Sequence, residues 1–327
     1  MKAFGTWERV LLALLVLLLA GFGLGLDGFM TPYALADSTF NFSEKGLLAL
    51  AMALLIVAGE IDLSIAATMA LSSLAMGLAM KAGAGLPLMI LAAFATGALA
   101  GSLNGWLVTA YRLPSIVVTI GTLSLYRGIA LVALGDQAIT GYPEPLSVLG
   151  NGYLGDLIGA PWLIVPIEFI VFLLMAAAVG TLLHRTVVGR RVYAIGANPI
   201  ASRFSGIEVD RYRFWLFVFA GVAAALAAVM LTGRIGSTRP NIALGWELDA
   251  VTMVILGGVA IEGGRGSIVG TVLAALLMGV FTFALGMVNV SGIVMSMLIG
   301  VLLVVAMVLP RLGLSRWWRP RATAVGA

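Results

Sequence analysis

The sequence predicts an all-α integral membrane protein of about ten transmembrane helices, some of them short or broken. Of its 327 residues, 61% are hydrophobic and only 10% are charged, whereas a soluble domain contains roughly 25% charged residues. Successive apolar runs are long enough to cross a bilayer, which takes about 20 residues per helix. The runs are continuous, whereas the strands of a membrane barrel would alternate in polarity.

Ten apolar segments follow one another, and together they form a single transmembrane domain over residues 1–327. Polar breaks, loops or clusters of Gly and Pro separate them. In order, the segments are 9–26, 46–58, 63–80, 86–111, 116–134, 162–183, 214–232, 250–260, 268–288 and 293–309.

The positions of Lys and Arg predict how these segments are oriented. With the N-terminus in the cytoplasm, fourteen cations fall in inside loops and four outside, while Arg127 lies within a span. The four outside are Lys45, Lys81, Arg234 and Arg239. Cytoplasmic loops have an excess of Lys and Arg, so both termini are expected in the cytoplasm. Loop 135–161 has no Lys or Arg and is expected to pack on the outer face.

Segments 46–58 and 250–260 are too short to cross as simple helices. The first ends at the polar break 59–62 and the second at the glycine-rich break 262–266, and a long apolar run follows each. The two regions look like a weak internal repeat, and interrupted helices in corresponding halves indicate a transport pathway at the repeat interface. A tight hairpin at the membrane surface is the other interpretation of each break.

Ionisable and polar residues within spans are costly, and each is therefore a candidate for function. Glu60 and Asp62, at the first break, are either hairpin charges that reach interfacial water or the carboxylate pair of an ion-coupled carrier. Asn104 is a further candidate, with close helix packing as its other role.

Arg127 and Glu168 fall inside two different predicted spans, and Thr119 lies close to Arg127 in the sequence. The arginine and the glutamate either pair with each other as a structural lock or line the pore. Thr119 is included among the residues that could line it.

The composition argues against enzymatic, metal and nucleic-acid functions. There is no Cys and a single His, His184, so neither a thiolate site nor a site with several histidines can form. None of the three lysines follows a glycine, so the Gly-Lys-Ser/Thr of a Walker A motif is missing. We expect no catalytic residue and no cofactor in this chain, and any ATP that its function needs must be bound by another protein. The cations lie beside spans, which favours the lipid bilayer over nucleic acid as their partner.

Loop 184–213 contains six arginines between two long apolar runs. Within it, Asn198 suits the N-cap of a helix, Pro199 the first helical position and Gly206 the stop. We therefore expect a short capped helix in this loop.

The expected helix has an apolar side. Ile200 and Phe204 are four residues apart and share one face, and exposed apolar side chains in such a loop imply a protein partner. A surface loop whose basic residues face lipid headgroups is the alternative.

Several dispersed stretches, in the right order, resemble the sugar-type permeases of bacterial ABC importers, the group for ribose, arabinose, xylose, rhamnose and autoinducer-2. The resemblance covers essentially the whole chain. The stretches are GEIDLS (59–64), PSIVVTIGT with RG (114–122, 127–128), GRRVYAIGANP with SGI (189–199, 205–207), ELDA with GG (247–250, 257–258) and GGRGS (263–267).

The resemblance implies a type II-like ABC importer permease, multi-pass in the bacterial inner membrane, with loop 184–213 as its cytoplasmic coupling loop. Two permease subunits, alike or paralogous, would form the pore, and a periplasmic binding protein would deliver sugar to loop 135–161. A cytoplasmic ATPase would dock on the short helix. The coupling residues implied are Asn198, Pro199, Ile200, Arg203, Phe204 and Gly206.

The sequence departs from the family at the first break, where Glu60 replaces the usual Gly. This adds a charge near the implied pathway and leaves the substrate open. The outer stretch 140–143 is most like the rhamnose and autoinducer-2 branch. Other candidate functions are a branched-chain amino acid permease, an ion-coupled carrier that uses Glu60, Asp62 or Glu168, and a channel-like membrane protein without an energy source.

Overall fold

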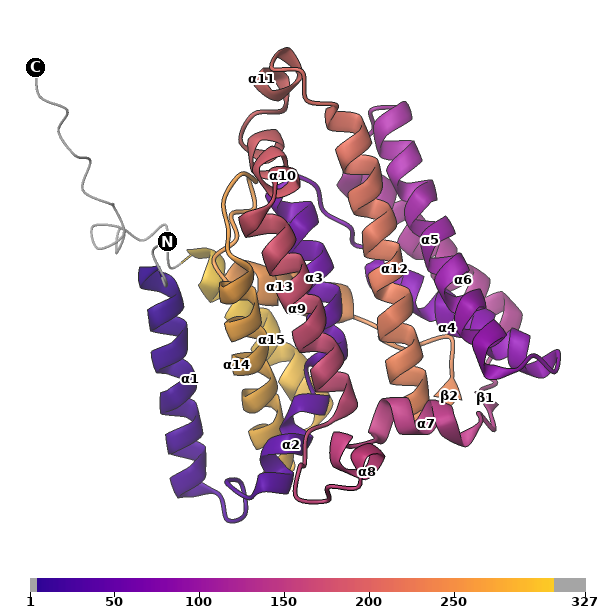
Figure 1. Cartoon of the computed structure of the whole chain (residues 1–327), viewed down its shortest axis with the longest axis vertical. Coiled ribbons are helices and arrows are strands. Elements are labelled where there is room, and N and C mark those ends of the chain that lie inside the picture. The colour runs from indigo at the N-terminus through magenta and orange to yellow at the C-terminus, as the bar shows by residue number, and fades with distance from the viewer. Residues whose placement is uncertain (1–4, 309–327) are drawn as a thin grey trace, which may run out of the picture.

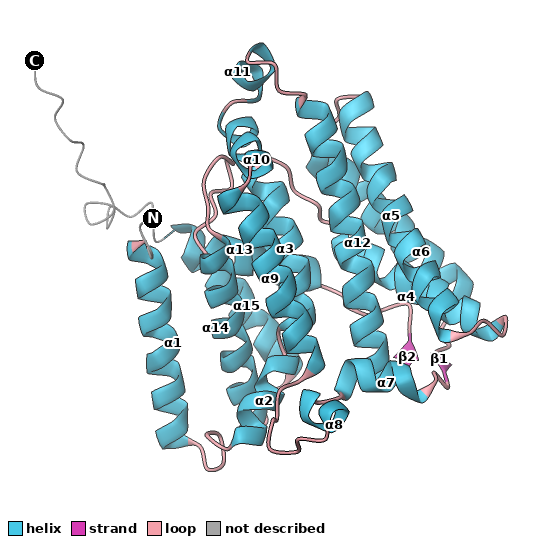
Figure 2. Ribbon diagram, in the orientation of Figure 1, coloured by secondary structure: helices cyan, strands magenta, loops and turns pink. Residues whose placement is uncertain are grey.

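The computed structural model describes residues 5–308, which form a helical bundle with one short pair of strands (Figure 2). Six of the helices described are long and apolar enough to cross a membrane. They are α1 (Thr6–Gly25), α5 (Leu86–Ala110), α6 (Ser115–Leu134), α9 (Ile167–Arg185), α12 (Val209–Ile235) and α14 (Ile268–Met287). The helices α2 (Pro32–Phe40) and α3 (Ser43–Val57) would make a seventh if this pair, bent by 48°, is one span.

Each of the ten predicted segments contains a helix, although six or seven meet the length and hydropathy expected of a span. The remaining ones are short: α4 (Ile65–Lys81), α13 (Trp246–Leu256) and α15 (Gly292–Val308). The end of the last predicted segment, residue 309, lies outside the described residues. Helix α9 begins at residue 167 rather than 162, since Pro166 is its N-cap.

Helix α3 has 15 residues, in agreement with the prediction that segment 46–58 is too short to cross as a simple helix, but the sequence did not predict the bent pair that it forms with α2. Helix α2 precedes α3, and it begins where the Thr31 hydroxyl accepts a hydrogen bond from the Ala34 amide at 3.2 Å, with Pro32 in the first position. Polar residues at 37–39 interrupt the apolar run. Hydropathy alone therefore missed this helix.

Small elements lie at both ends of the bundle (Figure 1). At one end are α10 (Val187–Ala197) and α11 (Pro199–Phe204), and we call this the α11 end. At the opposite end are α7 (Glu144–Asn151), α8 (Leu154–Ile158), β1 (Ile139–Thr140) and β2 (Ser237–Thr238). The two strands pair antiparallel, with Ile139 opposite Thr238. A Cβ on Gly150 of α7 would overlap the backbone of α12, so loop 135–161 packs tightly on the bundle.

The core is built around α3, which is buried along nearly its whole length among α9, α12, α13 and α14. A helix that is apolar on all sides belongs in such a position. Helix α12 packs closely on α5 along Gly97, Gly101 and Gly105, where any Cβ would collide with α12. Small residues spaced by four let two helix backbones approach each other. This pair is the rigid frame beneath the α11 end.

Candidate functional site

The predicted short helix is present as α11. The Asn198 side chain accepts a hydrogen bond from the Ala201 amide at 2.9 Å, Pro199 occupies the first position, and Gly206 follows the helix with a φ of +80°. Capping residues act within one turn of chain, so their signal is local and the sequence predicts it well.

The apolar side chains of α11 point away from the bundle. Phe204 is 90% exposed and Ile200 is 68% exposed, whereas Ser202, between them in the sequence, is buried. Helix α11 stands at the extreme tip of the molecule (Figure 1). Two exposed apolar side chains on one short helix form a surface suited to a partner protein.

Helix α11 is held to α12 by its other side. Arg203 forms an ion pair with Asp210 in the first turn of α12, and the Ile207 amide donates to the Ser202 carbonyl at 3.0 Å. A helix of six residues has little stability alone, so these contacts and the cap hold it in place.

Behind α11, three backbone segments meet almost without side chains between them. The end of α10 contacts the end of α3, because a Cβ on Gly196 would overlap the Val57 carbonyl oxygen. The same carbonyl accepts a hydrogen bond from the Gly264 amide at 2.8 Å, and Gly263 lies against Gly59. The two polar breaks, 59–62 and 262–266, therefore contact each other and loop 184–213. The sequence predicted both breaks but not that they meet.

The first break is also joined to α12 by a charge pair. The Glu60 carboxylate lies 2.8 Å from Nε of Arg213, with the side chains 7% and 20% exposed. The atoms form an ion pair without hydrogen-bond geometry, since Arg213 Nε has no hydrogen-bond partner. Burial raises the pKa of Glu60, and the arginine opposes that rise. Glu60, which replaces the usual Gly of the family, thus has Arg213 as its cationic partner. From the sequence, Arg213 is expected only to help orient the chain in the membrane.

Asp62 belongs to a buried polar network rather than to a carboxylate pair with Glu60. It accepts hydrogen bonds from the amide and hydroxyl of Ser64, at 2.9 and 2.6 Å, just before α4 begins. Asn104 of α5 donates to the Ser64 hydroxyl at 2.7 Å, and the Tyr126 hydroxyl of α6 donates to the Ala100 carbonyl at 3.0 Å. Asn104 therefore ties α5 to the start of α4 in the interior.

Thr119 lies against the same break. Its hydroxyl donates to the Ser115 carbonyl at 2.8 Å, and the Ser115 hydroxyl in turn accepts from the Ile61 amide at 3.2 Å. Thr119 is fully buried in this chain. The bond from Ile61 to Ser115 attaches the start of α6 to the break, and the Thr119 hydroxyl adds a longer one of 3.4 Å to the Ile61 carbonyl.

Arg127 and Glu168 do not pair, so that hypothesis is wrong. The Arg127 guanidinium donates to the carbonyls of Ile242 and Pro240, at 2.6 and 3.0 Å, in the loop before α13. Glu168 lies beside Glu44, and Arg234 is 2.7 Å from Glu44 and 3.9 Å from Glu168. Helix α6 packs on α4 and α5, whereas α9 packs on α3 and α10. Positions inside two predicted spans do not imply contact between the two residues, because the sequence does not say which helices are neighbours.

Comparison with known proteins gives the family. A family model described as "Branched-chain amino acid transport system / permease component" matches residues 34–307. This chain belongs to that family. It is therefore a permease component of a transport system, a transport protein rather than an enzyme, and its six or seven apolar spans agree with a multi-pass membrane protein.

Individual relatives of this permease are similar over nearly their whole length. Proteins named "Autoinducer 2 import system permease protein LsrD" from Escherichia coli (strain K12), Shigella flexneri and Escherichia coli O157:H7 are each 36% identical to it over 325 residues. The alignments cover 97% of this chain and 97% of each relative. No solved structure matches the permease significantly.

Proposed function

We propose that this permease is the membrane-spanning subunit of a bacterial ABC importer for a carbohydrate of the ribose, rhamnose or autoinducer-2 kind. The observation that supports it most is α11, a capped helix with Ile200 and Phe204 exposed at the tip of the molecule. A separate ATPase, which itself binds ATP, would dock on 198–206. The full-length similarity to autoinducer 2 permeases supports a sugar-like cargo.

We infer that the α11 end and both chain termini lie in the cytoplasm. Fourteen of the 19 Lys and Arg residues then fall in inside loops, as expected for cytoplasmic segments. All ten helical segments would lie in the membrane region, with the breaks near the inner surface. Loop 135–161 would face a periplasmic sugar-binding protein on the other side.

Coupling would proceed through the contacts behind α11. Closure of the ATPase dimer would displace α11, and α10 would transmit this to the end of α3 and to the 262–266 break through the glycine contacts at Gly196 and Gly264. The ion pair between Arg203 and Asp210 would transmit the same displacement to α12. Helix α12 would then move the first break through the ion pair between Arg213 and Glu60. Both breaks would move together and switch the pathway between inward- and outward-open states.

The pathway itself would be formed by two permease subunits, alike or paralogous. Selectivity would reside mainly in the binding protein, so a wide and weakly polar passage suffices. Asn104 and Arg127 then act as ties between elements that hold the passage in shape, and Thr119 adds a contact from α6 to the Ile61 carbonyl of the first break, which are the roles their buried partners support.

An ion-coupled carrier is less well supported by these contacts. Such a carrier needs carboxylates free to bind and release an ion, but Glu60 is paired with Arg213 and Asp62 accepts two bonds from Ser64. A branched-chain amino acid importer remains the second candidate, because the description of the matching family names that cargo.

Transport in proteoliposomes tests the proposal. Uptake of radiolabelled autoinducer 2, ribose or rhamnose should require the permease together with its ATPase, its binding protein and ATP. Uptake by the permease alone under a proton gradient would refute it. Uptake of leucine but of no sugar, with the complete complex, would favour the amino acid importer.

A further inference from the structure

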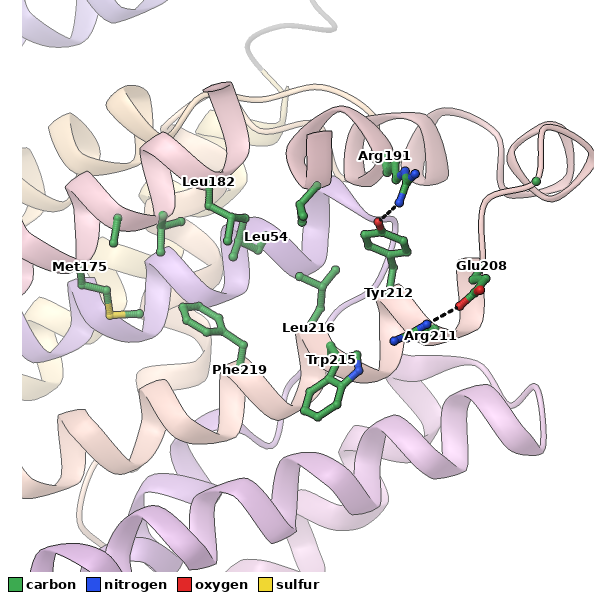
Figure 3. A pocket seen from close by; sticks show the side chains of 14 residues that line it. Leu54, Met175, Leu182, Arg191, Glu208, Arg211, Tyr212, Trp215, Leu216 and Phe219 are labelled. Carbon is green, nitrogen blue, oxygen red and sulfur yellow. Dashed lines mark hydrogen bonds and ion pairs between the residues drawn. The ribbon is translucent and has the colours of Figure 1, made fainter. Parts of the chain in front are cut away.

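A groove of about 680 Å³ runs between α9 and α12 over α3 at the α11 end. Its walls are apolar along most of their length, and Figure 3 shows Met175, Leu182, Leu54, Phe219 and Leu216 lining it. At the end nearest α11 the lining becomes polar and charged. A groove with one apolar length and one cationic end suits an amphipathic molecule.

The charged end consists of Arg191, Tyr212, Arg211 and Glu208. Arg191 donates to the Tyr212 hydroxyl at 2.6 Å, and Arg211 lies 3.0 Å from Glu208 (Figure 3). The Arg211 and Glu208 side chains are 71% and 65% exposed, and an ion pair so exposed is weak. Both guanidinium groups can therefore turn donors toward an anion that enters the groove.

The apolar length lies on the outer surface of two predicted spans. Trp215, beside the charged end, is 58% exposed, and Ala178, which lines the groove from α9, is also exposed. Such side chains face lipid in a membrane protein, and Trp is enriched where the apolar core meets the headgroups. The groove thus crosses the level at which a phospholipid changes from acyl chain to phosphate.

We propose that this groove binds an anionic phospholipid of the cytoplasmic leaflet. One acyl chain would lie against Leu54 and Leu182, and the phosphate would accept hydrogen bonds from Arg191 and Arg211. Basic pockets between transmembrane helices on the cytoplasmic side bind anionic headgroups, and the planar guanidinium matches phosphate geometry. This inference rests on the orientation proposed above.

The site has a consequence for coupling, because its wall includes Val188 of α10 and Gly206 directly after α11. A bound lipid would brace the coupling loop against α12. Membranes rich in anionic lipid should therefore increase the transport obtained per ATP hydrolysed.

Native mass spectrometry of the purified full-length permease tests binding without the ATPase, so its result does not depend on transport. The probes are phosphatidylglycerol and phosphatidylcholine. The wild type should retain phosphatidylglycerol preferentially, and Arg191→Gln with Arg211→Gln should weaken its binding by about 30-fold. Ala178→Trp, which fills the apolar length and leaves both arginines, should also reduce binding. Lys81→Gln, an exposed cation in the last turn of α4, is the matched control and should bind as the wild type does.

Three results would overturn the proposal. The first is equal retention of both lipids by the wild type, and the second is unchanged retention of phosphatidylglycerol by the double arginine variant. The third is a shift from dimer to monomer in Ala178→Trp with phosphatidylglycerol binding intact, which would assign the groove to a second permease copy. A wild type that shows no preference for phosphatidylglycerol but performs normal ATP-driven sugar uptake would refute this inference and leave the proposed function standing.

Discussion

The ion pair between Glu60 and Arg213 allows a quantitative prediction of how strongly loop 184–213 is tied to the first break. Glu60→Gln keeps the shape of the side chain but removes its charge, which leaves Arg213 without an anion. Breaking a fully buried pair by removing one partner costs about 3–5 kcal/mol, whereas an exposed pair contributes about 0–1 kcal/mol. With side chains 7% and 20% exposed, an intermediate loss of about 2 kcal/mol in the free energy of unfolding is expected.

A double-mutant cycle isolates this pairwise term. Glu60→Gln, Arg213→Met and the double variant are unfolded by titration with a denaturing detergent, and we expect a coupling energy of about 1–2 kcal/mol. The control is Glu208→Gln, which removes the exposed partner of Arg211 and should change stability by less than about 0.5 kcal/mol. A coupling energy below about 0.5 kcal/mol between positions 60 and 213 would refute the reasoning.

The same cycle has a functional readout. If the pair transmits motion from α12 to the break, Glu60→Gln should lower sugar uptake per ATP hydrolysed, while ATPase binding at α11 stays normal. Uptake per ATP equal to that of the wild type would mean that the pair stabilises the fold without coupling.

Three further predictions concern other parts of the structure. Ile200→Asp with Phe204→Asp should abolish co-purification of the ATPase but leave membrane insertion intact, because both side chains are exposed. Gly196→Ala should destabilise the protein by about 1–3 kcal/mol in the same detergent titration, because its Cβ would overlap a backbone carbonyl. Arg234→Gln should cost about 3–5 kcal/mol by leaving buried carboxylates uncompensated, and adding Glu168→Gln should recover part of that loss.

Each of these has an outcome that contradicts it. Normal co-purification of the ATPase with the double aspartate variant would exclude α11 as the docking helix. Gly121→Ala is the control for Gly196→Ala, since Gly121 lies within α6 and has open space around it. An equal loss of stability in the two variants would show that the close contact at Gly196 is not the cause of the loss. If adding Glu168→Gln to Arg234→Gln lowers the free energy of unfolding further, then Glu168 and Glu44 do not compete for Arg234.

Local signals explain the part of the site that the sequence predicted well. Asn198, Pro199 and Gly206 specify where α11 begins and ends through contacts within a single turn, so their meaning can be read without knowing any neighbour. The polar breaks at 59–62 and 262–266 were likewise evident from composition, and the structure places both between helices.

Contacts between residues that are far apart in the sequence could not be predicted from such local signals. Arg127 and Glu168 fall at plausible depths for a pair, but α6 and α9 pack on different helices, and each residue found other partners. From their positions in the sequence, Arg213 and Arg234 predict only the orientation of the chain in the membrane, yet in the structure they form ion pairs with Glu60 and Glu44. A charge at a break signals that a cation is needed nearby, but not which cation provides it.

The sequence by itself determined the membrane class, the family, the succession of helical segments and the short capped helix, because hydropathy, motifs and caps depend on residues close together along the chain. Only the tertiary structure decided that both breaks meet beneath α10 and that Glu60 faces Arg213. It also decided that a groove with a cationic end opens between α9 and α12. These features depend on which helices are neighbours, and that choice follows from close packing such as the α5–α12 glycine contact, which involves residues more than one hundred positions apart.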